Sequence, residues 1–256
     1  MPDKPPQNVF RIFLLISVSL FLTITSIYST GVEESGLTIQ KRSSSTSSIG
    51  QDAKPIESTM YFSNQTVHEV RSDGNESIVY LKEKRFVTLN STAKTYSEVT
   101  FDELEQKLDE ITKKMSEESA EQQEATEMLQ RLLGDSAGQL SVEKLGPGEP
   151  ILGFATEKHL ITAPPMTIEL WAAPELQIPA EYYDSLKINA QPNPFFDMQR
   201  LFDAFKSIDG FSLRTIVTVK AMGAEIRSID EVVSVEEGPV PPPRIPTDYQ
   251  KVELDF

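Results

Sequence analysis

The chain has 256 residues, of which 39% are hydrophobic and 25% are charged, an ordinary composition for a globular protein. Its formal net charge of -15 argues against nucleic acid as a partner, because an acidic surface repels phosphates. The sequence has no cysteine and only 2 histidines, which excludes disulfides, thiolate metal sites and cysteine nucleophiles and leaves little for a histidine metal centre.

The N-terminal segment is typical of an export signal. Arg11 precedes an uncharged, mostly apolar stretch, 12–28, and small residues follow at Ser29 and Gly31. We predict that residues 1–31 form either a cleaved signal peptide or an uncleaved hydrophobic helix that anchors the chain in a membrane. Export without cysteine favours the bacterial cell envelope, with the domain in the periplasm or membrane-anchored outside the cytoplasm.

Residues 32–55 are rich in Ser and Thr and predict a linker, although the run "GLTIQ" could supply one strand. We expect residues 56–256 to form a single domain. Its first part predicts a β-meander, because short β-branched and aromatic runs alternate with turn signals such as Asp73-Gly74. These runs are "STMYF", "TVHEV", "SIVYL" and "RFVTL".

A helix is predicted to follow the meander. Thr100 and Glu103 form a capping-box pattern at its start, and Gly134 is a candidate C-cap. The polar run "SEESAEQQE" interrupts the apolar face, so we expect a break at 116–119 that divides the segment into two helices. The apolar face itself consists of Phe101, Leu104, Leu108, Ile111 and Met115.

The second half returns to strands, which we expect in "QLSVEKLG", "ILGFATEKHLIT" and "TIELWAAP". A short helix is predicted from Pro179 and a longer one after the cap Asn193-Pro194. The alternating run 211–221 then forms a hairpin with the following strand through Gly223. A change of apolar phase between Ile226 and Val233 indicates a β-bulge.

The proline-rich segment "GPVPPPRIP" is interpreted either as a polyproline ligand for another domain or as a stiff strap along the fold. The predicted fold class is therefore α+β. We expect a curved, mostly antiparallel sheet, a half-barrel, with helices packed on its concave face and a hydrophobic helix preceding it.

The order of these runs resembles a known family. The stretches "KTYSEVTFDEL", "PILGFATEKHLITAPPMTIELWAAPEL", "IDGFSLRTIVTVKAMG", "EVVSVEEGPVP" and "IPTDYQKVEL" resemble the bacterial domain-of-unknown-function 4412 family. More distantly, they are similar to the lipoprotein-carrier half-barrels. This resemblance implies an exported domain whose incomplete barrel is closed by helices, and in the carriers such a cavity holds acyl chains. It implies no catalytic residue.

Phenylalanines in the helix before Gly210 and in the strand after it suggest an apolar cavity on the concave face. The alternative is that these side chains form a close-packed core. The alternation does not determine which face of the sheet carries Trp171, the only tryptophan, but we expect its side chain to be buried. The candidate ligand-binding residues are Trp171, Phe195, Phe202, Phe205, Phe211, Leu213, Val217 and Val219.

No motif points to catalysis or to a cofactor. His159 lies in a strand-like run without a nucleophile motif, and acidic pairs such as Glu236-Glu237 are typical of a solvated surface. The first hypothesis is a non-enzymatic envelope domain that binds a lipid, an acyl chain or a lipoprotein, and contacts the membrane only if residues 1–31 are uncleaved. The second is an envelope protein-interaction module, and the third is a hydrolase that uses buried carboxylates.

Overall fold

One 12-stranded sheet holds most of the residues that the computed structural model describes, which are 34–48, 50, 52–107, 110, 140–179, 181–186, 198–221 and 223–253. The strand order is β12-β6-β5-β4-β3-β2-β1-β11-β10-β9-β8-β7, and every neighbouring pair is antiparallel except β12 and β6. The strands are β1 (Glu34–Ser47), β2 (Ile56–Phe62), β3 (Thr66–Arg71), β4 (Asn75–Tyr80), β5 (Arg85–Asn90), β6 (Thr95–Thr100), β7 (Ser141–Pro147), β8 (Glu157–Ala163), β9 (Met166–Ala173), β10 (Phe211–Ala221), β11 (Ala224–Val240) and β12 (Gln250–Lys251).

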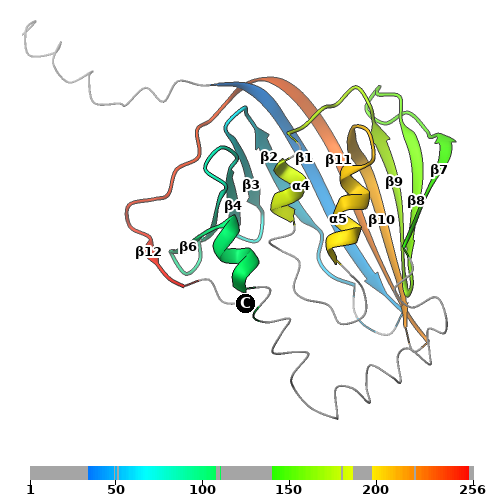
Figure 1. The fold of residues 1–256 in the computed structure, drawn as a ribbon, viewed down its shortest axis with the longest axis horizontal. Coiled ribbons are helices and arrows are strands. Elements are labelled where there is room, and N and C mark those ends of the chain that lie inside the picture. Colours follow the sequence, from blue (N-terminus) through cyan, green and yellow to red (C-terminus); the bar gives the residue numbers. More distant parts are fainter. Residues whose placement is uncertain are drawn as a thin grey trace, which may run out of the picture. The chain divides into compact units, whose positions relative to one another are not determined.

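The sheet is large, open and curved, and it carries few helices, as Figure 1 shows. The predicted meander corresponds to β2–β6, and the predicted hairpin corresponds to β10 and β11. Gly74 and Gly223 both have positive φ at their turns, where a residue with a side chain would be strained. The predicted hydrophobic N-terminal helix lies outside the described residues.

β1 differs from the expected linker. Its 14 residues pair with β11 along their whole length and with β2 over Leu37–Ser43, so the strand lies in the middle of the sheet. Its Ser and Thr residues have no strong strand pattern of their own. The long pairing with β11 fixes their conformation, because tertiary context overrides a weak local preference.

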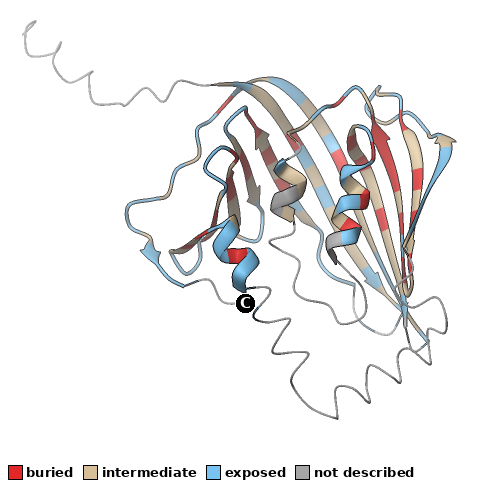
Figure 2. Ribbon diagram, viewed as in Figure 1, coloured by how far each residue is buried: buried red, intermediate tan, exposed pale blue. Residues whose placement is uncertain are grey.

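Two helices pack on one face of the sheet, which we call the inner face. From α4 (Glu181–Leu186), the Tyr182 ring lies 5.5 Å from the ring of Phe62 and 6.5 Å from that of Phe211. From α5 (Met198–Lys206), Leu201 and Ala204 are buried against β8 and β9. Figure 2 shows that the buried residues gather on the strands and helices that face one another.

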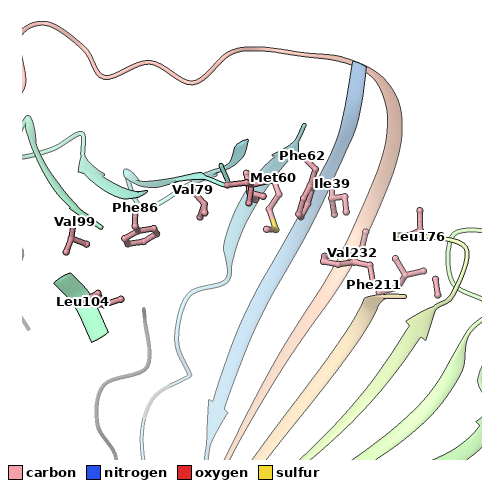
Figure 3. Close-up of a cluster of buried hydrophobic side chains, with 14 residues drawn as sticks. Ile39, Met60, Phe62, Val79, Phe86, Val99, Leu104, Leu176, Phe211 and Val232 are labelled. Carbon is pink, nitrogen blue, oxygen red and sulfur yellow. The ribbon is translucent and has the colours of Figure 1, made fainter. Parts of the chain in front are cut away.

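Two apolar clusters fill the inner face. The first extends from β6 across β1 to β10, and Figure 3 shows its side chains, from Val99 and Phe86 at one end to Phe211 at the other. The second joins β8 and β9 to α5 through residues such as Ile168 and Leu170. The inner face is therefore covered in two places.

The helix that follows β6 begins as predicted, and its described part is 101–107. The backbone N–H of Thr100 donates to Glu103 Oε2 at 2.9 Å, and the N–H of Glu103 donates to Thr100 Oγ1 at 3.2 Å, which completes the capping box. Leu104 is buried in the first cluster beside Val99 (Figure 3). The expected break at 116–119 and the expected cap at Gly134 lie outside the described residues, and so does the cap Asn193-Pro194.

The proline-rich segment packs against the fold. β11 continues to Val240, and the chain then runs to β12 at the edge beside β6 (Figure 1). Ile245 and Tyr249 contact an apolar cluster of Ile78, Val87 and Leu89 on the outer face of the sheet. Residues 241–251 are therefore called the strap, as the second interpretation of this segment expected.

Two details differ from the expected strands or refine them. Residues 151–156 form a turn closed by a bridge between Ile151 and Phe154, so β8 begins only at Glu157. The register of β1 and β11 shifts where Gln40 pairs with Ser234 and Lys41 with Val232, which leaves Val233 as the bulged residue. The bulge thus lies at the end of the interval that the apolar pattern indicated.

Candidate functional site

A cavity of about 320 Å³ lies where the two inner-face clusters meet. The strands β9, β10 and β11 form its floor, and α4 and α5 with the turn after α5 form its cover. Its volume is within the range of small-molecule pockets, at the lower end of about 300–1,000 Å³. The apolar lining consists of Leu170, Ala172, Tyr182, Tyr183, Leu186, Phe202, Phe205, Ile208, Phe211, Val217 and Val232.

The local sequence explains how these side chains reach the cavity. Leu170 of β9 pairs with Thr215 of β10, which pairs with Asp230 of β11, so the three residues form one row across the floor. Phe202 and Phe205 lie three residues apart on α5 and therefore share a helix face, with ring centroids 6.5 Å apart. The strand period and the helix period thus direct apolar groups into the same space.

Four of the predicted site residues line this cavity, namely Phe202, Phe205, Phe211 and Val217. Leu213 is fully buried in the first cluster, and Val219 packs against the second cluster. Phe195 lies outside the described residues. The cavity therefore brings together only part of the predicted set.

Trp171 lies on the opposite, outer face of the sheet. Its neighbours in register are Lys158 and Arg214, whose charged groups lie 4.5 Å and 5.5 Å from the ring centroid. The residue is nevertheless only 8% exposed, because the segment around Gly148 and Thr156 covers it. Trp171 is thus buried, as expected, but it does not form a wall of the cavity.

The cations beside Trp171 are themselves paired with carboxylates. Lys158 Nζ lies 2.6 Å from Glu169 Oε2, and Arg214 Nε lies 2.7 Å from Glu231 Oε1. Arg214 also forms an ion pair with Glu149. This arrangement joins the covering segment to the sheet and accounts for the burial of Trp171 without a ligand.

Charged residues lie at one end of the cavity lining, on β1 and β11. Lys41 and Asp230 both contribute to the lining and are both half-buried. Lys41 Nζ lies 3.3 Å from Glu69 Oε1 of β3 and reaches it across β2, where Lys41 pairs with the small, buried Ser58. Burial alone lowers the pKa of Lys41, but Tyr182, Glu69 and Asp230 together raise it above its ordinary value, so the ammonium group is charged at neutral pH.

Asp230 has a different environment. Its Oδ1 accepts a hydrogen bond from the Ser43 hydroxyl, and none of the cationic side chains in the described residues forms an ion pair with it. The charged residues of the lining are therefore Lys41, which is paired with Glu69, Glu231, which is paired with Arg214, and Asp230, which forms no ion pair with the described residues.

Two further titratable side chains, Tyr183 of α4 and His159 of β8, are neutral at neutral pH. Burial and the neighbouring Tyr182 raise the pKa of Tyr183 to about 12, so its hydroxyl stays protonated, and it donates to the Gly210 carbonyl at 3.4 Å. Burial lowers the pKa of His159, whose Nε2 lies 3.9 Å from Glu157 Oε2. Over the described residues, we find no group of three His, Asp or Glu side chains that could hold a metal ion.

Lys41, Asp230 and the Tyr182-Tyr183 pair were not among the predicted site residues. Lys41 and Ser43 lie in the Ser-rich segment that predicted a linker, and no local motif connects them to β11. The tyrosines lie in the predicted short helix, where two adjacent aromatic residues could have indicated a contact with the core. In the described part of the chain, no helix is both long and apolar enough to span a membrane.

The fold and the cavity define a class: an α+β domain with an open, curved antiparallel sheet and an apolar cavity beneath its helices. A family model described as a domain of unknown function, DUF4412, matches residues 106–249, which is more than half of the chain. The chain therefore belongs to the DUF4412 family, as the sequence runs indicated. A comparison with curated proteins found no match.

The solved structures share only a distant similarity with this chain. A structure of PNGF-II in space group C2 is 11% identical with a TM-score of 0.39, and the alignment covers 86% of this chain and 31% of that one. A DUF1329 family protein from Desulfovibrio piger ATCC 29098 is 6% identical with a TM-score of 0.28, and the alignment covers 81% of this chain and 87% of that one. The chain thus spans about a third of the length of PNGF-II.

Proposed function

We propose that this protein is a non-enzymatic domain of the bacterial envelope that binds a hydrophobic ligand, a lipid or an acyl chain, in the cavity between β9–β11 and the helices α4 and α5. The observation that carries the proposal is the apolar lining of this cavity of about 320 Å³. The envelope location rests on the export pattern of residues 1–31.

The composition of the lining supports an aliphatic ligand. Leu170, Phe202, Phe205 and Val217 present hydrocarbon surface, and each methylene group that leaves water for such surroundings contributes about 0.8 kcal/mol. Phe202 and Phe205 lie on α5, a separate element from the strands of the floor. A modest displacement of this helix would enlarge the cavity without breaking the sheet ladder.

A matched pair of substitutions tests whether the ligand occupies this cavity. Val217→Phe places a larger side chain in the cavity, whereas Val233→Phe adds the same atoms at a position that is 43% exposed. Both variants are titrated with a neutral phenylnaphthylamine dye, whose fluorescence rises in apolar surroundings. If Val217→Phe excludes two or more methylene equivalents, its affinity falls by more than about tenfold, since each is worth about 0.8 kcal/mol.

Circular dichroism must show that both variants keep the wild-type secondary structure. Equal dye affinity in the two folded variants, or no dye binding by the wild type, would contradict the proposal. Lipids extracted from the protein purified from a bacterial envelope and identified by mass spectrometry would then name the natural ligand.

A further inference from the structure

We propose that the polar end of the cavity, formed by Asp230 and Lys41, selects an amphiphile with a cationic amine head group over one with a carboxylate head group. This inference rests on the proposed function, since it assigns a polar partner to the ligand whose apolar part the cavity holds. Its basis is the position of Asp230, which lines the same cavity as Phe205 and Val217.

The pairing of the charges determines which head group fits. Lys41 is half-buried and its ammonium group already lies 3.3 Å from Glu69 Oε1, so it has a carboxylate partner. Asp230 accepts a hydrogen bond from the neutral Ser43 hydroxyl and, over the described residues, pairs with no cation. Lys41 and Arg71 interact with Asp230 only at longer range. A primary ammonium group carries three donors and a positive charge and could form the direct ion pair that this carboxylate does not make with the described residues.

The surrounding charges also favour a positively charged head group. Beyond Lys41, Glu69 and Asp230, the end of β3 and the turn after it carry Arg71 and Asp73, which pair with each other at 2.6 Å. Arg71 also interacts electrostatically with Glu69 and Asp230. These five groups carry two positive and three negative charges. A fatty-acid carboxylate would therefore enter a region with an excess of negative charge, on a chain whose net charge is -15.

Tyr182 also favours an amine head group over a carboxylate. It lines the cavity beside Lys41, and burial raises its pKa, so its ring carries a neutral phenol at neutral pH. The face of a neutral aromatic ring attracts a desolvated cation and does not attract a carboxylate. Asp230 and Tyr182 thus contribute one carboxylate and one aromatic side chain to the same lining.

Three probes of equal chain length test the inference: decylamine, decanol and decanoate. Each displaces the neutral phenylnaphthylamine dye from the wild-type protein, from Asp230→Asn and from Glu237→Gln. Asparagine keeps the shape of Asp230 and can still accept the Ser43 hydrogen bond. Glu237 lies on the same strand, is exposed, and gives the same change of net charge away from the cavity.

The wild-type protein is expected to bind decylamine at least about tenfold more tightly than decanoate, with decanol between them, because a hydrogen bond to a charged group is stronger than one between neutral groups. In Asp230→Asn this preference falls by at least about tenfold while decanol affinity stays the same, and Glu237→Gln behaves as the wild type. Decanol binding without a preference for the amine, or a preference that survives in Asp230→Asn, would overturn the inference and leave the cavity proposal standing. If none of the three probes displaced the dye, the result would instead contradict the proposed function, the binding of a hydrophobic ligand in the cavity.

Discussion

At the scale of single residues, Trp171 is held on the outer face between Lys158 and Arg214, and Gly148 closes over its ring. A Cβ atom added at Gly148 would lie 2.5 Å from Thr156 Oγ1 and 2.7 Å from Trp171 Cδ1. Such distances require the covering segment or the indole to move. The burial of Trp171 therefore depends on Gly148, which is distant in sequence. The turn at Ile151–Phe154 brings this glycine back over the indole ring.

The substitution Gly148→Ala is expected to destabilise the protein by about 1–3 kcal/mol, the usual cost of overpacking. Urea unfolding followed by the fluorescence of Trp171 measures this change, and the folded emission should also move towards longer wavelength. Gly238→Ala is the control, because no atom lies within 4 Å of the Cβ it would add. An unchanged unfolding midpoint for Gly148→Ala would show that the segment does not pack on Trp171 as described.

Sequence periodicity separated the two faces of this strand but left open which of them carries Trp171 towards the helices. Ile168 and Leu170 alternate with Glu169 and Trp171, so the sequence correctly separates the two faces of β9. It does not show that residues 148–156 fold back to cover the outer face, because that contact depends on a turn at Ile151–Phe154 within a run that resembled a strand. The alternation predicts which residues share a face, but not what covers each face.

At the scale of elements, the capping box at the start of the helix 101–107 is a local feature that the sequence predicted in full. The side chains of Thr100 and Glu103 accept hydrogen bonds from each other's backbone N–H groups, because N–H groups at the start of a helix have no acceptor within it. All the atoms of this interaction come from four consecutive residues. Such features can be predicted from sequence because they need no distant contact.

Thr100→Ala is expected to lower the free energy of unfolding by about 1 kcal/mol, the usual cost of losing an N-cap side chain. Thermal unfolding monitored by circular dichroism measures the loss. Thr247→Ala, at an exposed position in the strap, should leave the unfolding temperature unchanged. A loss of equal size in both variants would mean that the effect does not arise from the cap.

The strap is held to β6 by ion pairs as well as by apolar contacts. Glu98 accepts hydrogen bonds from Lys251 at 2.8 Å and from Arg85 at 2.7 Å. The hydrogen bond from Lys251, then that from Arg85, lower the pKa of Glu98 below its ordinary value of 4.5, against the opposing effect of burial. Because the pKa is lower in the folded state, Glu98 stabilises the fold at pH values above about 4.5 and loses this effect as the pH falls through the folded pKa.

Glu98→Gln is therefore expected to lower stability at pH 7 by about 0.5–1 kcal/mol, as for a partly exposed pair. The difference from the wild type should shrink as the pH falls below about 4.5, since the wild-type carboxylate then becomes protonated. Urea unfolding at a series of pH values from neutral to acid measures both. Glu237→Gln serves as the control, and a difference that is constant across this range would contradict the assignment.

At the scale of the whole molecule, the cavity exists because segments far apart in sequence meet. Ser43 and Asp230 are 187 positions apart, yet they share a hydrogen bond at its polar end. The pairing of β1 with β11 brings them together, and no turn or motif in the sequence predicts this pairing. The class of the fold could thus be predicted from alternating runs and turn signals, whereas the central strand and the polar half of the candidate site could not.

The central claim is that a hydrophobic ligand occupies the cavity between the sheet and its helices. Solution NMR of methyl-labelled protein with decanol tests this claim most directly, because intermolecular nuclear Overhauser effects report which methyl groups lie beside the ligand. We predict such effects from the decanol chain to the methyl groups of Leu170 and Val217, and none to those of the exposed Val142 and Val233. Effects confined to the exposed methyl groups, or none at a saturating concentration of decanol, would contradict the claim.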